Sequence, residues 1–201
     1  MQYVLIIVLV LSSFGINAQN YSKFSFRGEL YPNLSIPLSL FKAIKNSKPD
    51  INFGLLIEYK ASENINLNTG IKYTTTGIKS TVNLFDINGT SLGKSVTKEI
   101  NTLLSVPFLF QYNTNGLFIE FGPNVSYLIG YKLLNDGIVV SSGIPTKTKL
   151  IVGGLFAMGY EVNITESVLF KTNLYTKLIQ LQYRPLNVGV GIGLRYKFKS
   201  N

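Results

Sequence analysis

The 201-residue chain contains no cysteine, no histidine and no tryptophan. Without cysteine it has no disulfides and no thiolate ligands for a metal. Without histidine it also lacks the usual zinc sites and the catalytic pairs that histidine forms with serine or cysteine. We therefore expect no catalytic residues, no metal and no cofactor. The enzymatic alternative that remains is an outer-membrane hydrolase that works through carboxylates alone.

Charged residues are scarce, at 14% of the chain. Typical soluble domains have about 25%. Basic residues dominate the few that are present, and the formal net charge is +9. Such an excess raises nucleic acid as a partner until the charges are located. A soluble protein with so few charges would have difficulty covering its surface.

Long apolar runs are rare too, and the clearest one lies at the N-terminus. It extends from Tyr3 to Leu11 and is followed by small and polar residues up to Ala18. This pattern predicts a secretory signal peptide, residues 1–18, which is cleaved after Ala18 and leaves one domain, residues 19–201. A membrane anchor is the alternative, but the run is shorter than the roughly 20 apolar residues that a spanning helix needs.

Beyond residue 19, apolar and polar residues alternate with a period of two, which is the pattern of β-strands. The alternating segments are residues 23–35, 51–60, 64–78, 98–112, 116–130, 148–162, 166–177 and 187–198. Their lengths are close to the roughly 9–11 residues of a tilted membrane strand.

Short and long connections between these segments alternate along the chain. The short ones are residues 60–64, 113–116 and 163–167, and the long ones are about 36–50, 79–97, 131–147 and 178–186. This layout predicts an all-β protein, an eight-stranded antiparallel up-and-down transmembrane β-barrel with short periplasmic turns and longer external loops. The first long link could hold one helical turn before Pro49.

The composition of the two faces indicates which one points inward. The polar face is rich in Gly, Asn, Ser and Thr rather than in Lys and Glu, so it would make a poor water-exposed surface. Aromatic residues lie near strand ends on the apolar face, as expected for interfacial girdles: Tyr59, Tyr73, Tyr112, Tyr160, Tyr196 and Phe198. We therefore expect the apolar face to meet lipid. The alternative is a soluble periplasmic lipid-binding barrel with its apolar face inside.

The same alternation places charged residues of both signs in the lumen. They are Arg27, Lys72, Lys171 and Arg195 against Glu29, Glu58, Glu120 and Glu161. Buried charges are tolerated when they are paired, and an eight-stranded barrel is narrow enough for side chains to fill. We interpret the eight residues as a structural charge network in a plugged interior. A narrow ion pore is the alternative.

Three glycines in "NVGVGIGLRYKF" resemble a phosphate-binding loop at first sight. Their spacing is G-x-G-x-G, whereas a dinucleotide fingerprint needs G-x-G-x-x-G before a helix. A spacing of two puts Gly189, Gly191 and Gly193 on one face of the last strand. We interpret them as barrel-closing glycines that leave space for large lumen neighbours.

The excess positive charge maps to the long links. Counted together with the residues at their edges, these links contain eleven basic and three acidic residues, a net of +8: Lys42, Lys45, Lys48, Asp50, Lys79, Asp86, Lys94, Lys98, Lys132, Asp136, Lys147, Lys149, Lys177 and Arg184. In an outer membrane these links would meet lipopolysaccharide phosphates. We expect outer-membrane lipids including lipopolysaccharide as partners, the barrel-insertion machinery, and an unknown protein partner. We expect no nucleic acid, and a monomer.

The stretch "LLSVPFLFQYNTNGLFIEFGPNVSYLIGYKL" (103–133) resembles the central hairpin of the PorT-like outer-membrane β-barrel family of Bacteroidetes-type Gram-negative bacteria. The matching pieces are "VPFLFQYN" with Pro107, the turn Asn113–Gly116, and "LFIEFGPNVSYLIG" with Glu120, Gly122 and Pro123. The closing "VGVGIGLRYKF" also resembles that family's last strand. The resemblance implies an integral barrel in the outer membrane. The resemblance itself says little about role, and our leading hypothesis is a structural, adhesive or partner-binding role.

Overall fold

The computed structural model describes residues 23–37, 47–143, 150–180 and 185–198. The expected signal peptide and the possible helical turn before Pro49 lie outside these residues. No helix in the described ranges is long and apolar enough to cross a membrane.

The described residues form nine β-strands. They are β1 (Phe24–Pro37), β2 (Lys48–Lys60), β3 (Ile65–Phe85), β4 (Ser91–Thr114), β5 (Leu117–Asn135), β6 (Ile138–Gly143), β7 (Leu150–Asn163), β8 (Val168–Ile179) and β9 (Pro185–Lys197).

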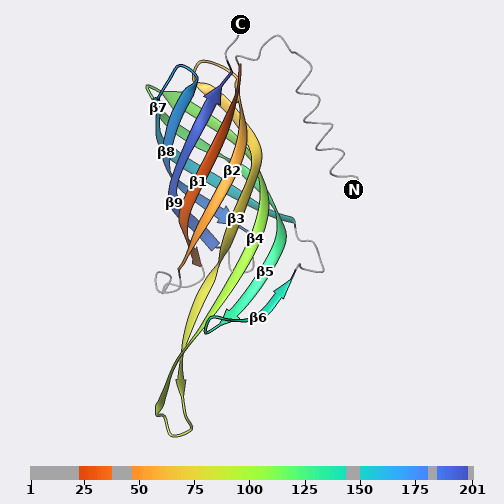
Figure 1. Ribbon diagram of the computed structural model, residues 1–201, viewed down its shortest axis with the longest axis vertical. Coiled ribbons are helices and arrows are strands. Elements are labelled where there is room, and N and C mark those ends of the chain that lie inside the picture. The colour runs from red at the N-terminus through yellow and green to blue at the C-terminus, as the bar shows by residue number, and fades with distance from the viewer. Residues whose placement is uncertain (1–22, 38–46, 144–149, 181–184, 199–201) are drawn as a thin grey trace.

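Eight of these strands close into a ring (Figure 1). Each is antiparallel to its neighbours, β1 pairs with both β2 and β9, and the β4–β5 pairing completes the circle. The short strand β6 pairs only with the far end of β5 and stays outside the ring. The predicted eight-stranded up-and-down barrel is therefore confirmed, with one extra strand at the external end.

Apolar side chains point out of the barrel and polar ones point in. Along β2, Phe53, Leu55 and Ile57 are 53%, 72% and 37% exposed, whereas Asn52 and Glu58 on the opposite face of the strand are buried. The period-two alternation of the sequence thus becomes a lipid-facing outer surface and a polar interior. This orientation is the reverse of the one that a soluble ligand-binding barrel requires.

The predicted aromatic girdle lies on the outer surface near the short turns. Tyr59, Tyr112, Tyr160 and Tyr196 are all partly exposed there. Tyr73 lies toward the opposite rim, where its ring stacks on that of Phe53 at 5.0 Å between centroids. Amphipathic rings at these two levels are typical of the lipid–water interfaces.

The link predicted at residues 79–97 is wrong as a loop. Strand β3 continues to Phe85 and β4 begins at Ser91, so both strands leave the ring as a long hairpin (Figure 1). The third link likewise contains the end of β5 and all of β6. These extensions lie beyond the apolar band, so they lack the alternation between apolar and polar residues that marks the membrane strands.

Two tight turns reverse the chain sharply at opposite ends of β5. Asn115–Gly116 joins β4 to β5, with φ values of 49° and 84°, and Asp136–Gly137 joins β5 to β6, with 49° and 86°. Positive φ at both central residues defines the hairpin turn that Asn-Gly and Asp-Gly favour, because glycine adopts this conformation without steric cost.

Candidate functional site in the barrel lumen

All eight lumen charges predicted from the sequence lie in one connected network near the short-turn end of the barrel. Ion pairs link six of them in a closed cycle: Arg27, Glu58, Arg195, Glu161, Lys171 and Glu120. Glu29 and Lys72 branch from Arg27. Seven of the eight ring strands therefore contribute a charge to this network.

Arg27 lies at the centre of the network. Its guanidinium donates Nη2 to Glu120 Oε2 at 2.8 Å and also contacts Glu58, while Nε lies 2.9 Å from Glu29 Oε1. The residue is 1% exposed. A guanidinium presents several donors in a fixed plane, so one arginine can hold three carboxylates in place.

Arg195 and Lys171 close the cycle on the other side. Arg195 Nη1 lies 2.9 Å from Glu58 Oε2, and its Nη2 lies 3.1 Å from Glu161 Oε2. Lys171 Nζ lies 3.3 Å from Glu120 and 3.6 Å from Glu161. Each carboxylate of the cycle thus faces two cations, which offsets the cost of burying it.

Sequence reasoning missed Gln111, which supplies the contribution of the eighth ring strand, β4. Its Oε1 accepts from Arg27 at 3.1 Å, from Lys171 at 2.9 Å and from Asn68 at 2.9 Å. Its Nε2 donates to Glu161 at 3.0 Å. A search for charges alone overlooks this fully buried amide, although the alternation already placed position 111 on the inward face.

Aromatic rings fill the middle of the lumen beside the charges. Lys72 Nζ lies 2.6 Å from the hydroxyl of Tyr31, whose ring meets that of Tyr175 edge-on at 4.7 Å between centroids. Lys171 Nζ lies 3.8 Å from the ring centroid of Phe118. Lys72 Nζ also lies 4.3 Å from the ring centroid of Tyr31. The two cation–π contacts add attraction where water has been excluded.

Three charged residues that we assigned to the external links lie instead in the external half of the lumen. Lys48, Asp50 and Lys177 were counted among the link charges that face outward, but all three are buried inside the barrel. The strands extend further than predicted, so the alternation carries these side chains inward. Lys48 and Asp50 pair with each other.

Lys177 stands apart from the charge network. Its Nζ donates to the hydroxyls of Thr74 at 3.1 Å and Ser105 at 3.2 Å, and among the described residues it forms no ion pair with a carboxylate. It is 2% exposed. A buried ammonium held only by hydroxyls is an uncompensated charge.

Apolar clusters occupy the remaining space. One cluster contains Tyr31, Leu109, Leu155, Ala157 and Tyr175, and a second, toward the external end, contains Leu103, Leu128, Ile151 and Ile179. The cavity between Lys72 and Lys177 measures about 10 Å³. That volume holds about one water molecule.

The three closing glycines face inward on β9. A Cβ atom on Gly189 would lie 2.7 Å from Cβ and 2.8 Å from Cα of Asn33, and one on Gly193 would lie 2.8 Å from the carbonyl oxygen of Gly28. At Gly191 the nearest atoms belong to the side chain of Asn173. The tightest backbone approaches are thus to β1, across the seam where the first and last strands meet.

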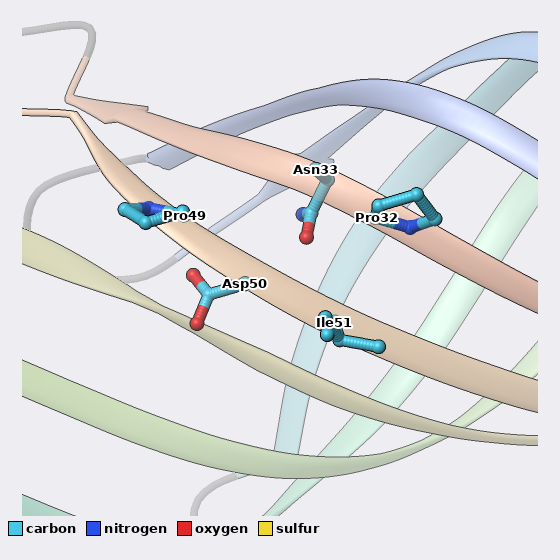
Figure 2. Close-up of a pocket in the computed structure, with 5 residues that line it drawn as sticks. All are labelled: Pro32, Asn33, Pro49, Asp50 and Ile51. Atoms are coloured by element: carbon cyan, nitrogen blue, oxygen red, sulfur yellow. The ribbon is translucent and has the colours of Figure 1, made fainter.

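An open depression beside the external-end halves of β1 and β2 has a volume of about 480 Å³ (Figure 2). Its lining residues are Pro32, Asn33, Pro49, Asp50 and Ile51. Asp50 is already engaged by Lys48, by Ser35 at 2.8 Å and by Thr75 at 2.9 Å. The depression therefore presents mainly apolar side chains and proline rings.

The chemistry available to these side chains is limited. Within the described ranges, no group of three or more acidic residues is arranged to hold a metal ion. Glu120 and Glu161, two of the lumen carboxylates, both lie in ion pairs near the short turns. The site is a buried electrostatic network that joins every strand of the ring.

A closed antiparallel barrel with an apolar exterior and a polar, ion-paired interior defines an integral membrane β-barrel protein. Residues 7–201 match the family model described as outer membrane protein beta-barrel domain. The chain belongs to this family and is an outer-membrane protein of a Gram-negative bacterium.

Several solved structures are similar to the chain at low sequence identity. Neisserial surface protein A is 13% identical with a TM-score of 0.48, over 88% of this chain and 98% of that one. Ail, the attachment invasion locus protein of Yersinia pestis, is 13% identical with a TM-score of 0.47, over 88% and 99%. OprG from Pseudomonas aeruginosa is 19% identical with a TM-score of 0.40, over 88% and 96%. No curated protein matches the chain in sequence.

Proposed function

We propose that the protein is a closed structural barrel of the outer membrane, with a plugged, charge-paired interior and no catalytic activity. The observation that carries this proposal is the cycle of six ion-paired side chains across the lumen. Moving an ion through it would require breaking several buried pairs, each of which leaves an uncompensated charge. The interior is therefore a scaffold that fixes the strands.

Conductance in a planar lipid bilayer tests this proposal. We expect the purified barrel to give no steady conductance steps. The matched control is a double variant, Arg27→Ala with Glu120→Ala, which removes one ion pair from the cycle and keeps the lumen charges balanced. Its role is to show that an opened lumen is detectable. Steady large conductance from the unmodified protein would contradict a plugged interior and favour the pore alternative.

A partner-binding or adhesive role is the second candidate, and the β3–β4 hairpin favours it. Large apolar side chains near its tip are well exposed: Val82, Leu84, Phe85, Ile87 and Leu92. Exposed apolar groups of this kind mark contact sites for other molecules. A photo-crosslinking residue at Ile87 on intact cells should yield a defined adduct, and one at Lys60, beside a short turn, should not. If no adduct formed at Ile87, the partner-binding role would be rejected and only the structural role would remain.

The remaining expectations belong to the same proposal. We infer cleavage after Ala18, membership of the PorT-like branch of the family on the strength of residues 103–133, insertion by the barrel-insertion machinery, and a monomer. Outer-membrane lipids, including lipopolysaccharide, are the proposed environment of the basic external residues. Mass spectrometry of the mature N-terminus and of the intact protein in detergent would test cleavage and stoichiometry.

A further inference from the structure

Three lysines meet on one face of the sheet where β3, β4 and β5 leave the ring. Lys79 of β3 lies directly opposite Lys98 of β4. Lys132 of β5 lies opposite Ile100, two residues along β4 from Lys98. Residues opposite one another, and residues two apart, share a face of a sheet, so the three side chains form one group. We call Lys79, Lys98 and Lys132 the lysine triad.

The lysine triad lies on the outer surface, just beyond the lipid-facing band. Along β4, Leu104 shares the face of Lys98 and is 41% exposed, whereas Ser105 on the other face is buried in the lumen. On β5, Tyr127 is also 41% exposed below Lys132. The three lysines lie on the same outer face as Leu104 and Tyr127, but nearer the external end of the barrel.

No acidic side chain neutralises the triad within the described part of the chain. Glu99 points to the opposite face, where it accepts from Asn101 at 2.9 Å. Asp136 accepts from Ser95 at 3.1 Å and from the backbone of Val96 at 2.7 Å. Like charges placed directly opposite on neighbouring strands destabilise the pairing. Lys79 and Lys98 are such a pair. No acidic partner among the described residues offsets their repulsion.

We propose that the lysine triad binds phosphate groups of the lipopolysaccharide headgroup in the outer leaflet. The inference rests on the proposed function, which puts this end of the barrel at the cell surface among anionic lipids. Opposing side chains on adjacent strands have Cβ atoms about 5 Å apart, and diagonal ones about 7–8 Å. Three flexible ammonium groups at these spacings can surround one phosphate or bridge two. A lipid headgroup fits better than a free anion because the triad borders the lipid-facing band.

The experiment compares two charge-matched double variants of the full-length barrel in detergent. Lys79→Gln with Lys98→Gln removes two triad charges, and Lys23→Gln with Lys60→Gln removes two exposed lysines near the short-turn end. Affinity is measured for purified lipopolysaccharide, for lipopolysaccharide stripped of phosphate, and for inorganic phosphate. Heat-modified gel mobility verifies that every variant is folded. A variant with arginine at positions 79 and 98 tests whether restoring the positive charge restores lipopolysaccharide binding.

We expect the triad variant to bind lipopolysaccharide at least about tenfold more weakly. The control should stay within about twofold, stripped lipopolysaccharide should bind weakly to all forms, and arginine should restore affinity. Equal losses in both variants, or unchanged binding after phosphate removal, would overturn the inference. Strong binding of inorganic phosphate that displaces the lipid would make the triad a free-anion site and would also overturn it. Conductance is measured separately, so a failure of the plugged interior is distinguishable from a failure of this site.

Discussion

At the scale of single residues, the lumen separates charges that are compensated from one that is not. Lys171 contacts two carboxylates, Glu120 and Glu161, whereas the contacts of Lys177 are to hydroxyls. Both lysines are almost fully buried on the same strand, β8. Removing one partner of a buried ion pair leaves the other charge exposed to a low dielectric, whereas removing an unpaired charge relieves a cost.

Methionine at each of these two positions should therefore have opposite effects. Lys171→Met should lower the free energy of unfolding by about 3–5 kcal/mol. Lys177→Met should leave it unchanged or raise it, by about 1 kcal/mol or more. Urea unfolding of the barrel from lipid vesicles measures both. Equal destabilisation by the two substitutions would mean that Lys177 has a counter-charge in the folded protein.

The closing glycines give a second test at this scale. Gly189→Ala should reduce the yield of heat-modifiable barrel, because a Cβ atom there meets backbone atoms of β1 that cannot move independently. Gly154→Ala is the matched control, since a Cβ atom at Gly154 meets nothing within 4 Å. Gly191→Leu should also impair folding, because it must displace the side chain of Asn173. A Gly189→Ala protein that folds as well as the control would contradict the close approach at the seam.

At the scale of elements, alternation predicted the membrane strands well and the external ones poorly. Segment 51–60 lies within β2, and segment 116–130 lies within β5 except for its first residue, because lipid on one side and a polar lumen on the other impose a period of two. The far ends of β3 and β4 face water on all sides. Their Ser, Thr, Lys and Asn residues therefore resemble a loop in sequence, although they pair as strands.

The same limit explains the site residues that sequence reasoning misplaced. Lys177 is the last residue of the predicted segment 166–177, whereas β8 continues to Ile179, so an error of two residues in this boundary moved it from the lumen to the link. Lys48 and Asp50 were misplaced for the same reason. Lumen leucines such as Leu109 and Leu155 weaken the contrast between the two faces, since they are apolar residues at positions where the alternation predicts polar ones. The eight paired charges stood out because charge is rare inside a membrane.

Removing the external hairpin should leave the barrel intact. A variant with Asn-Gly in place of residues 80–97 would join Lys79 to Lys98, which are already opposite one another. The ion-pair cycle draws its residues from elsewhere in the ring, so the temperature at which gel mobility changes should stay within a few degrees of the unmodified protein. Loss of the folded form would show that the hairpin is needed for assembly.

At the scale of the whole molecule, the fold is a polar interior wrapped in an apolar surface. The ring leaves no strand unpaired in the membrane, as a bilayer demands, because backbone groups in lipid must bond within the protein. The network of charges, Gln111, the aromatic pair and the leucine clusters then fills the enclosed space. Sequence alone indicated the ring of strands, and which of its faces is apolar and which polar. How completely side chains fill the lumen depends on packing, which a linear pattern does not contain.

Thiol labelling of single-cysteine variants tests this arrangement most directly, because the natural chain has no cysteine. The three positions are Ala157 in the lumen, Met158 on the lipid-facing surface and Ile87 near the hairpin tip. On intact cells, a membrane-impermeant maleimide should label Ile87→Cys readily. It should leave Ala157→Cys unlabelled until the protein is heat-unfolded, and Met158→Cys should react only with a reagent that partitions into lipid. Labelling of Ala157→Cys in the folded barrel at the rate of Ile87→Cys would mean a water-filled lumen and would contradict the account.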